Sequence, residues 1–181
     1  MEPSRSLLAL IDFQVRLMPA MENAAAILLN ARRLKDAALM LSVPVVVTEQ
    51  NPAGLGGTVA DLGLAPAEHG AASIPVISKL AFGACSSEAF VSAIGDRPDV
   101  VVTGCESHIC VLQTAMGLLD HGRRVLVVED AIGSRRAANK DAALRRLERN
   151  GAEIVTTEMV IFEWVRAFDN PAFKRAVALV R

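Results

Sequence analysis

Residues 99–110 have the sequence DVVVTGCESHIC, in which a short apolar run leads into a turn that contains glycine, histidine and two cysteines. The run lacks the polar alternation of a half-exposed strand, so it predicts a strand that is buried on both faces. Cys110 then opens a stretch with helical spacing, residues 110–121. A buried strand that leads into a helix is typical of a parallel α/β fold, because parallel strands need crossover connections.

Apolar runs of the same kind recur along the chain, with helical patterns between most of them. This alternation predicts an α/β fold, a three-layer α/β/α sandwich with a mainly parallel, doubly wound sheet, in a single domain of residues 1–181. Residues 51–72, rich in Gly, Ala and Pro, predict a long functional loop. The predicted strands are 6–11, 43–48, 74–78, 99–103, 124–128 and 152–156, and the predicted helices are 24–41, 86–95, 110–121, 139–150 and 171–180.

Charge and composition exclude several classes of partner. The 181 residues include 19 Lys and Arg against 20 Asp and Glu, a formal net charge of -1 that attracts neither nucleic acid nor an anionic membrane. No apolar run approaches the roughly 20 residues of a membrane span, and the apolar stretch in MEPSRSLLAL is too short for a signal peptide. We therefore expect a small-molecule substrate, with no nucleic-acid or membrane partner.

Two further features suggest where the protein works and in what assembly. Its cysteines number three, which argues for free thiols in a reducing compartment and so for a cytoplasmic protein. A hydrophobic content of 52% favours a buried subunit interface, so we expect a homo-oligomer, a dimer or a tetramer.

Reactive residues follow three of the predicted strands. Asp12 follows the first and Lys79 the third, while Cys110 lies in the turn after the fourth. Ligands of an open parallel sheet bind outside the carboxyl ends of its strands, so these residues should converge. A helix N-terminus should lower the pKa of the Cys110 thiol, the Asp12 carboxylate would take its proton, and the Lys79 ammonium would offset the charge repulsion.

Each of these residues also has an ordinary structural explanation. An aspartate after a strand is commonly a turn residue, and a strand-end lysine is commonly a solvated surface group. Cys110 could be a small core residue on an apolar helix, and we interpret Cys85 and Cys105 as structural. The shared position of Asp12, Lys79 and Cys110 at strand ends favours the functional interpretation.

Several blocks along the chain resemble the isochorismatase-like cysteine hydrolases, and within them the isochorismatase domain-containing proteins. The blocks are LLALIDFQ, TEQNPAGLGGT, SKLAF, VVTGCESHICVLQTAMGLLDHG and VVEDAIGSR. The resemblance implies that Cys110 is the nucleophile, Asp12 the general base and Lys79 the group that positions or charges the pair. It also implies a cis peptide bond at Cys105–Glu106 and an oxyanion hole built from the backbone N–H groups of Glu106 and Cys110. The residues that it implies along the substrate pocket are Gln14, Gln50, Phe82 and His108.

The sequence departs from the family pattern in two places. Leu80 and Gly83 stand where the family often has small hydroxylic residues, which puts transfer of substrate specificity in doubt. The histidine motif of the metal-binding nicotinamidase branch is also absent, and His69 is the only histidine near that place. We therefore predict no metal and no cofactor.

Three functions remain open at this point. The first is hydrolysis of a C–N bond in a small amide or related compound through a covalent acyl-enzyme at Cys110. The second is the vinyl-ether cleavage of isochorismate, which needs an acid rather than a thiol. The third is a catalytically silent oligomeric binding protein, suggested by the high apolar content and the altered SKLAFGAC block.

Overall fold

The computed structural model describes residues 1–64 and 73–181, and in these ranges six parallel strands form one sheet. The strand order is β3-β2-β1-β4-β5-β6, so the chain builds outward in one direction from β1 and in the other from β4. Ligand sites of such sheets lie where the order reverses, here between the carboxyl ends of β1 and β4. The strands are β1 (Ser6–Ile11), β2 (Val45–Gln50), β3 (Val76–Lys79), β4 (Asp99–Cys105), β5 (Arg124–Gly133) and β6 (Glu153–Val155).

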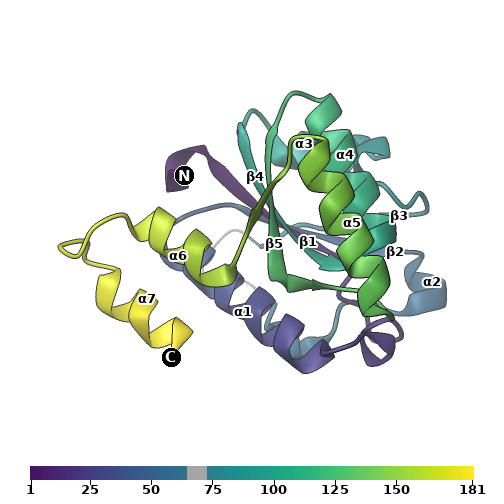
Figure 1. Cartoon of the computed structure of the whole chain (residues 1–181), viewed down its shortest axis with the longest axis horizontal. Helices are drawn as coiled ribbons and strands as arrows, with labels where there is room; N and C mark the ends of the chain where they lie inside the picture. Colours follow the sequence, from purple (N-terminus) through teal and green to yellow (C-terminus); the bar gives the residue numbers. More distant parts are fainter. Residues whose placement is uncertain (65–72) are drawn as a thin grey trace.

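Helices cover both faces of the sheet and complete the three layers (Figure 1). Successive strand residues point to opposite faces, so Leu8 and Leu10 join one core cluster while Leu7 and Ala9 join the other. The α/β sandwich expected from the sequence is confirmed. Helices α1 (Ala24–Met40), α6 (Thr157–Val165) and α7 (Phe173–Val180) share the first cluster, and α3 (Glu88–Ile94), α4 (Leu112–Asp120) and α5 (Ala137–Arg149) the second.

The third strand differs from its prediction. We expected residues 74–78 to be buried on both faces, but β3 begins at Val76 and exposes both Val76 and Ser78. The reason is its position at the edge of the sheet, where it pairs only with β2. Its last residue, Lys79, is buried, so the strand still delivers a side chain to the interior.

Three helical segments also differ from their predictions. Residues 157–165, which we left outside any helix, form α6, with the side chain of Thr156 accepting a hydrogen bond from the Met159 N–H. The predicted helix 110–121 is preceded by a π-helical turn, Ser107–Val111, so Cys110 lies inside helical backbone rather than at its start. The final helix begins at Phe173, two residues later than expected.

The expected loop 51–72 contains short helical turns in its described part. The four-residue α2 (Pro52–Leu55) and a 3₁₀ turn (Ala60–Leu62) lie there, and residues 65–72 are outside the described ranges. Further 3₁₀ turns are Pro3–Arg5, Met18–Ala20 and Ala84–Ser86.

Gly104 allows β4 to approach β1 closely at the switch point of the sheet. Its φ is +137°, and a Cβ atom built on it would lie 2.1 Å from the Ile11 carbonyl oxygen. Ile11 immediately precedes Asp12, and Gly104 immediately precedes Cys105. A side chain at Gly104 would therefore push apart the two strand ends that carry the candidate site.

We expect Gly104→Ala to lower the free energy of unfolding by at least about 2 kcal/mol, because it combines an unfavourable φ with a backbone clash. Urea denaturation followed by circular dichroism measures the change. Gly122→Ala is the matched control, since Gly122 also has a positive φ, +71°, but no atom within 4 Å of its added Cβ. Equal destabilisation by the two substitutions would contradict the close-approach explanation.

Candidate active site

Asp12 and Lys79 form an ion pair that is buried at the carboxyl edge of the sheet. Lys79 Nζ lies 2.7 Å from Asp12 Oδ2, with Asp12 fully buried and Lys79 6% exposed. The other carboxylate oxygen, Oδ1, accepts a hydrogen bond from Thr48 Oγ1 at 2.7 Å. Three adjacent strands, β1, β2 and β3, thus supply the carboxylate and two donors that hold it.

Lys79 uses all three of its ammonium protons inside the protein. Besides Asp12, Nζ donates to Gln50 Oε1 at 3.1 Å and to the Phe82 carbonyl oxygen at 3.0 Å. A lysine ammonium has three donors and no acceptor. Asp12, Gln50 and the backbone that follows β3 therefore hold the ammonium, which also hydrogen-bonds with the Cys110 thiol.

Cys110 lies beside this pair at the wall of a small cavity. The thiol-bearing residue is 5% exposed, and the cavity has a volume of about 90 Å³. The other residues that line it are Leu17, Gln50, Leu55, Phe82, Glu106 and Ile109. A larger cleft of about 370 Å³ lies between α1 and α5, but neither Cys110 nor Lys79 lines it, so reactive chemistry rather than volume identifies the candidate site.

The environment of Cys110 favours the neutral thiol. Its pKa is raised from an ordinary value of 9.0 to about 12, and burial is the largest cause. The charge of Asp12 and its hydrogen bond with the thiol act in the same direction, while Lys79 opposes them. The expectation of a lowered pKa at a helix N-terminus was wrong, because desolvation and the Asp12 carboxylate outweigh the Lys79 ammonium at this site.

The alkylation rate of a cysteine that rests as a neutral thiol depends on pH. Because the pKa of Cys110 is raised to about 12, the thiolate fraction rises about tenfold per pH unit throughout the range below it. We expect the iodoacetamide alkylation rate of Cys110, followed by peptide mass spectrometry, to rise in this way from about pH 7 to about pH 9. A plateau near pH 7 would show instead that a thiolate is already present.

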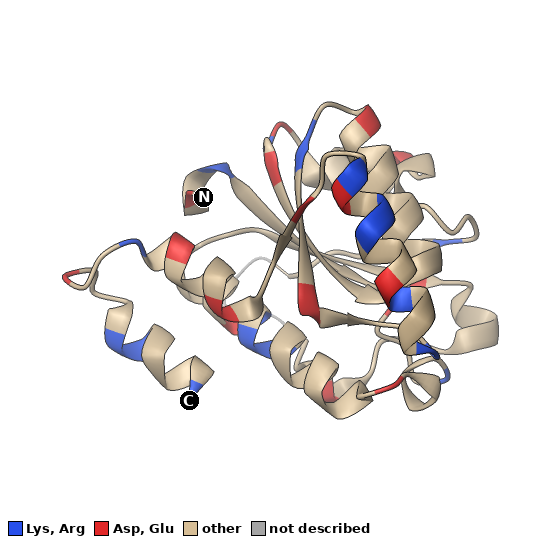
Figure 2. Cartoon of the chain, in the orientation of Figure 1, with Lys and Arg blue, Asp and Glu red and all other residues tan. Residues whose placement is uncertain are grey.

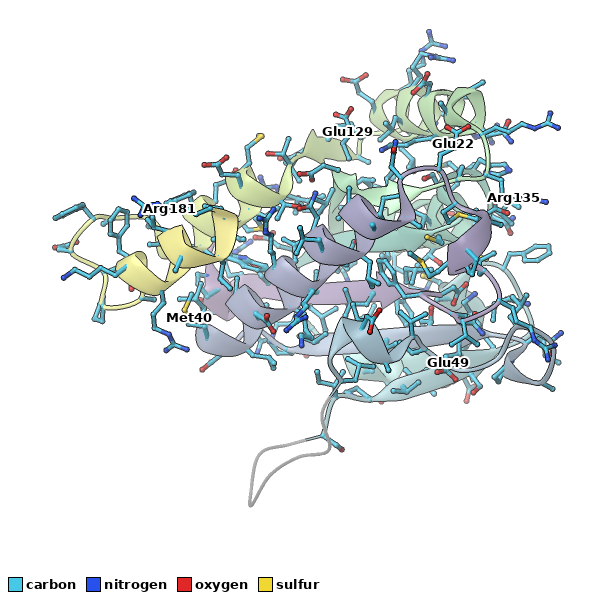
Figure 3. The ribbon with its side chains drawn as sticks, turned by 90° about the horizontal axis from the view of Figure 1, so that it is seen from below. Glu22, Met40, Glu49, Glu129, Arg135 and Arg181 are labelled. Atoms are coloured by element: carbon cyan, nitrogen blue, oxygen red, sulfur yellow. The ribbon has the colours of Figure 1, made fainter. Side chains whose placement is uncertain are left out.

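Glu106 and Arg135 add a second ion pair beside the cavity. Arg135 Nε lies 3.0 Å from Glu106 Oε2 and 3.1 Å from Oε1, and the Arg135 backbone N–H donates to Oε2 at 3.1 Å. Glu106 is 5% exposed, whereas the Arg135 side chain is 59% exposed. Figure 3 shows Arg135 at the end of the molecule opposite the C-terminal residue, Arg181. Glu106 thus lines the cavity with its carboxylate paired to a cation that is largely exposed.

The backbone around Glu106 is unusual in its geometry. The Cys105–Glu106 peptide bond is cis, at the place that the family resemblance implies. The Glu106 carbonyl oxygen accepts hydrogen bonds from Ile109 N–H at 3.0 Å and Val111 N–H at 3.2 Å. The two N–H groups that the expected oxyanion hole requires, those of Glu106 and Cys110, are not used in these bonds.

The four side chains expected along the pocket divide into two pairs. Gln50 and Phe82 line the cavity. Gln14 is fully buried and does not line the cavity. It holds the loop that follows β2, since it donates to the carbonyl oxygens of Gln50 and Gly56 and accepts from the Gln50 N–H. His108 Nδ1 lies 3.0 Å from Ser134 Oγ, and its Nε2 lies 3.3 Å from Asn139 Nδ2. Gln14 and His108 are therefore engaged by the protein itself.

A family model described as the isochorismatase domain matches residues 6–159, most of the chain. The chain belongs to the isochorismatase family. It is 38% identical over 182 residues to isochorismatase domain-containing protein 2 of Bos taurus, a match that covers 99% of this chain and 84% of the relative.

Two more relatives extend this comparison. The chain is 34% identical over 181 residues to isochorismatase domain-containing protein 1 of Danio rerio and spans 62% of that protein's length. Among solved structures, one described as the MAR1 ribonuclease from Caenorhabditis elegans has a TM-score of 0.92 at 36% identity, covering 99% of this chain and 91% of that one. The family, and the arrangement of the whole domain, are thus shared.

Leu80 and Gly83, which depart from the family pattern in this isochorismatase-family chain, have different surroundings. Leu80 is 81% exposed, so its side chain faces away from the interior. A Cβ atom at Gly83 would lie 3.3 Å from the Gln113 carbonyl oxygen in α4, so this glycine permits a close contact between the loop and the helix. A hydroxylic residue at Gly83 would require that contact to open.

Sequence reasoning missed five residues that complete the site. Leu17, Leu55 and Ile109 form apolar walls, Thr48 holds Asp12, and Arg135 holds Glu106. Thr48 carried a usable signal, since it follows the apolar run of the second strand as a polar residue at the same sheet edge. Arg135 and the apolar walls belong to loops and turns whose approach depends on the tertiary fold.

No group of three or more His, Cys, Asp and Glu side chains suited to a metal occurs in residues 1–64 and 73–181. His69, the histidine considered above, lies outside those ranges. The absence of a metal and of a cofactor therefore stays a prediction.

Proposed function

We propose that the protein is a cysteine-dependent hydrolase of a small amide or a related C–N bond compound. One observation carries the proposal: Cys110 lines a cavity beside a buried carboxylate that is held by Lys79 and Thr48. Asp12, Lys79 and Cys110 are the catalytic residues in this proposal. Membership of the isochorismatase family supports the coarser statement that the protein is a hydrolase.

In the first half of the proposed reaction, Asp12 takes the thiol proton as Cys110 Sγ attacks the carbonyl carbon of the substrate. Because the pKa of Cys110 is raised, the resting residue is a thiol, and a base must remove its proton for the attack. The N–H groups of Glu106 and Cys110 would stabilise the negative oxygen of the tetrahedral intermediate. The C–N bond then breaks, the leaving nitrogen receives the proton from Asp12, and a thioester remains on Cys110.

In the second half, Asp12 takes a proton from water as the water oxygen attacks the thioester carbon. The C–S bond breaks, the acid product leaves, and the proton returns to the sulfur as the thiol is restored. Lys79 stays bonded to Asp12, Gln50 and the Phe82 carbonyl oxygen and positions the base. Gln50 and Phe82 contact the substrate, whereas Gln14 and His108 support the loops around it.

Intact-mass spectrometry after rapid acid quenching tests this function. Incubation with a panel of small amides should add the mass of the acyl group to the protein, and peptide mapping should locate it on Cys110. Turnover of an amide without any acyl adduct in the wild-type protein or in slow variants would argue against the covalent mechanism.

Two other activities can be assayed beside the amide panel. Direct incubation with isochorismate, with pyruvate as the readout, examines the vinyl-ether reaction. RNA degradation is a second arm, because the C. elegans structure is described as a ribonuclease. A cavity of about 90 Å³ leaves little room for a nucleotide, and basic and acidic residues are interspersed on the elements that Figure 2 displays. We therefore do not propose ribonuclease activity for this chain, and vinyl-ether cleavage stays the alternative reaction.

The silent-binder hypothesis makes a different prediction for the panel. It requires no acyl adduct and no turnover with any amide. Slow thiol labelling does not support it, since the raised pKa of Cys110 makes labelling slow in an active enzyme as well.

Assembly and location complete the proposal. We expect a homo-oligomer, a dimer or a tetramer, because Leu80 and Phe82 beside the edge strand β3 are 81% and 51% exposed. Light scattering after gel filtration measures the mass.

The three cysteines are free thiols, which suits the proposed cytoplasmic location. In the described residues, no helix is both long and apolar enough to cross a membrane.

A further inference from the structure

The cation beside the proposed nucleophile is already paired within the protein. Lys79 Nζ has three acceptors within the protein, at 2.7, 3.0 and 3.1 Å. Its charge is also matched by the Asp12 carboxylate in direct contact. Lys79 would have to give up a protein partner before it could bind a substrate carboxylate.

No unpaired cation lines the cavity in the described residues. Of the described residues that line the cavity, Glu106 is the one with a charged side chain. Its partner, Arg135, is largely exposed and does not line the cavity. Burial is the main cause that raises the pKa of the Cys110 thiol, so a negative charge in this space loses solvation by water.

The rest of the wall is apolar and the space is small. Leu17, Leu55, Phe82 and Ile109 surround the thiol, and the amide of Gln50 is engaged with Lys79 and with the Leu80 carbonyl oxygen. A volume of about 90 Å³ is several times the roughly 10–15 Å³ that a cavity needs on the same measure to hold one water molecule. An acyl group in this space would exchange water for apolar contacts.

We infer that the site selects substrates with a short, uncharged, apolar acyl group and rejects those that carry a carboxylate on it. This inference rests on the proposed function and specifies its substrate class. The chemistry suits the proposed reaction, because hydrolysis converts a neutral amide into a carboxylate product. An apolar wall without an unpaired cation would solvate that carboxylate poorly, so the features that select the substrate would also favour product release.

Charge selection can be measured without turnover. Iodoacetamide and iodoacetate have nearly the same size, and only iodoacetate is anionic. We divide the alkylation rate of Cys110 with iodoacetamide by its rate with iodoacetate. We expect this ratio to be at least about tenfold higher in the native protein than in the urea-denatured protein. Peptide mapping separates Cys110 from Cys85 and Cys105. Equal ratios in the native and denatured protein would overturn the inference.

Two substitutions at one position test whether charge is the cause. Leu55→Lys adds a cation to the cavity wall, and Leu55→Gln alters the same wall without charge. Leu55→Lys should reduce the native ratio at least about tenfold, and Leu55→Gln should leave it within about twofold. Circular dichroism verifies that each variant is folded. If the two variants give the same ratio, charge does not select the ligand; if either fails to fold, the wild-type ratio still decides.

Turnover separates failure of this inference from failure of the proposed function. Isobutyramide should exceed the anionic succinamate in kcat/KM by at least about 100-fold, and hexanamide should be slower than isobutyramide. Comparable turnover of succinamate would overturn the substrate class while the hydrolase function stands. If no amide is hydrolysed, the proposed function fails, and the alkylation ratio then decides alone whether the cavity excludes anions.

Discussion

Replacing Cys110 with alanine is expected to reduce kcat for the best amide substrate by at least about 10⁴-fold, because the reaction loses its nucleophile. Substrate binding should change far less, since the apolar walls of the cavity remain. Steady-state kinetics on the amide that gives the strongest acyl adduct measures the loss. Intact-mass spectrometry of Cys110→Ala should show no adduct with the same amide.

Cys85→Ala is the matched control for this substitution. Cys85 is half-buried, with its Sγ 3.7 Å from the Thr114 carbonyl oxygen, and it does not line the cavity. We expect its kcat to stay within about twofold of wild type. If Cys110→Ala keeps wild-type turnover, the acyl-enzyme mechanism is wrong.

Asp12→Asn is expected to lower kcat by at least about 10³-fold, because the thiol loses the base that removes its proton. It should also lower the free energy of unfolding by about 3–5 kcal/mol, since Lys79 would keep a buried charge without its partner. Kinetics and urea denaturation measure the two effects separately.

The double variant Asp12→Asn, Lys79→Met separates catalysis from stability. Removing both charges should restore most of the lost stability while turnover stays low. Asp99→Asn is a second control, because Asp99 is also buried but starts β4 at the opposite edge of the sheet. We expect wild-type kcat for Asp99→Asn. Restored turnover in the double variant would contradict the role of Asp12 as general base.

Burial changed the chemistry expected at Cys110. Sequence reasoning used the helix N-terminus, which stabilises a thiolate, and could not weigh the desolvation of a residue that is 5% exposed. The π-helical turn Ser107–Val111 also moved Cys110 away from the first position of the helix. The resulting resting thiol explains why the proposed mechanism needs a base in direct contact.

Helix α6 shows how a buried element escapes pattern analysis. Its sequence, TEMVIFEWV, is apolar on several sides, and Thr157, Val160, Ile161, Trp164 and Val165 are all buried. A helix that is covered on several sides lacks the amphipathic period by which surface helices are found. Its capping residue, Thr156, and the acidic Glu158 in the first turn were the available signals.

The sequence alone determined the α/β class, the order of the six strands along the chain and the strand ends that carry Asp12, Lys79 and Cys110. It could do so because apolar runs and helical spacing are local, and because parallel strands bring their carboxyl ends to one edge. Only the tertiary structure decided that β3 lies at the edge of the sheet and that Thr48 and Arg135 hold the two buried carboxylates. It also decided that Leu17, Leu55 and Ile109 close the cavity. Those features depend on contacts between residues far apart in the chain, and on the loss of water around them, which no local pattern encodes.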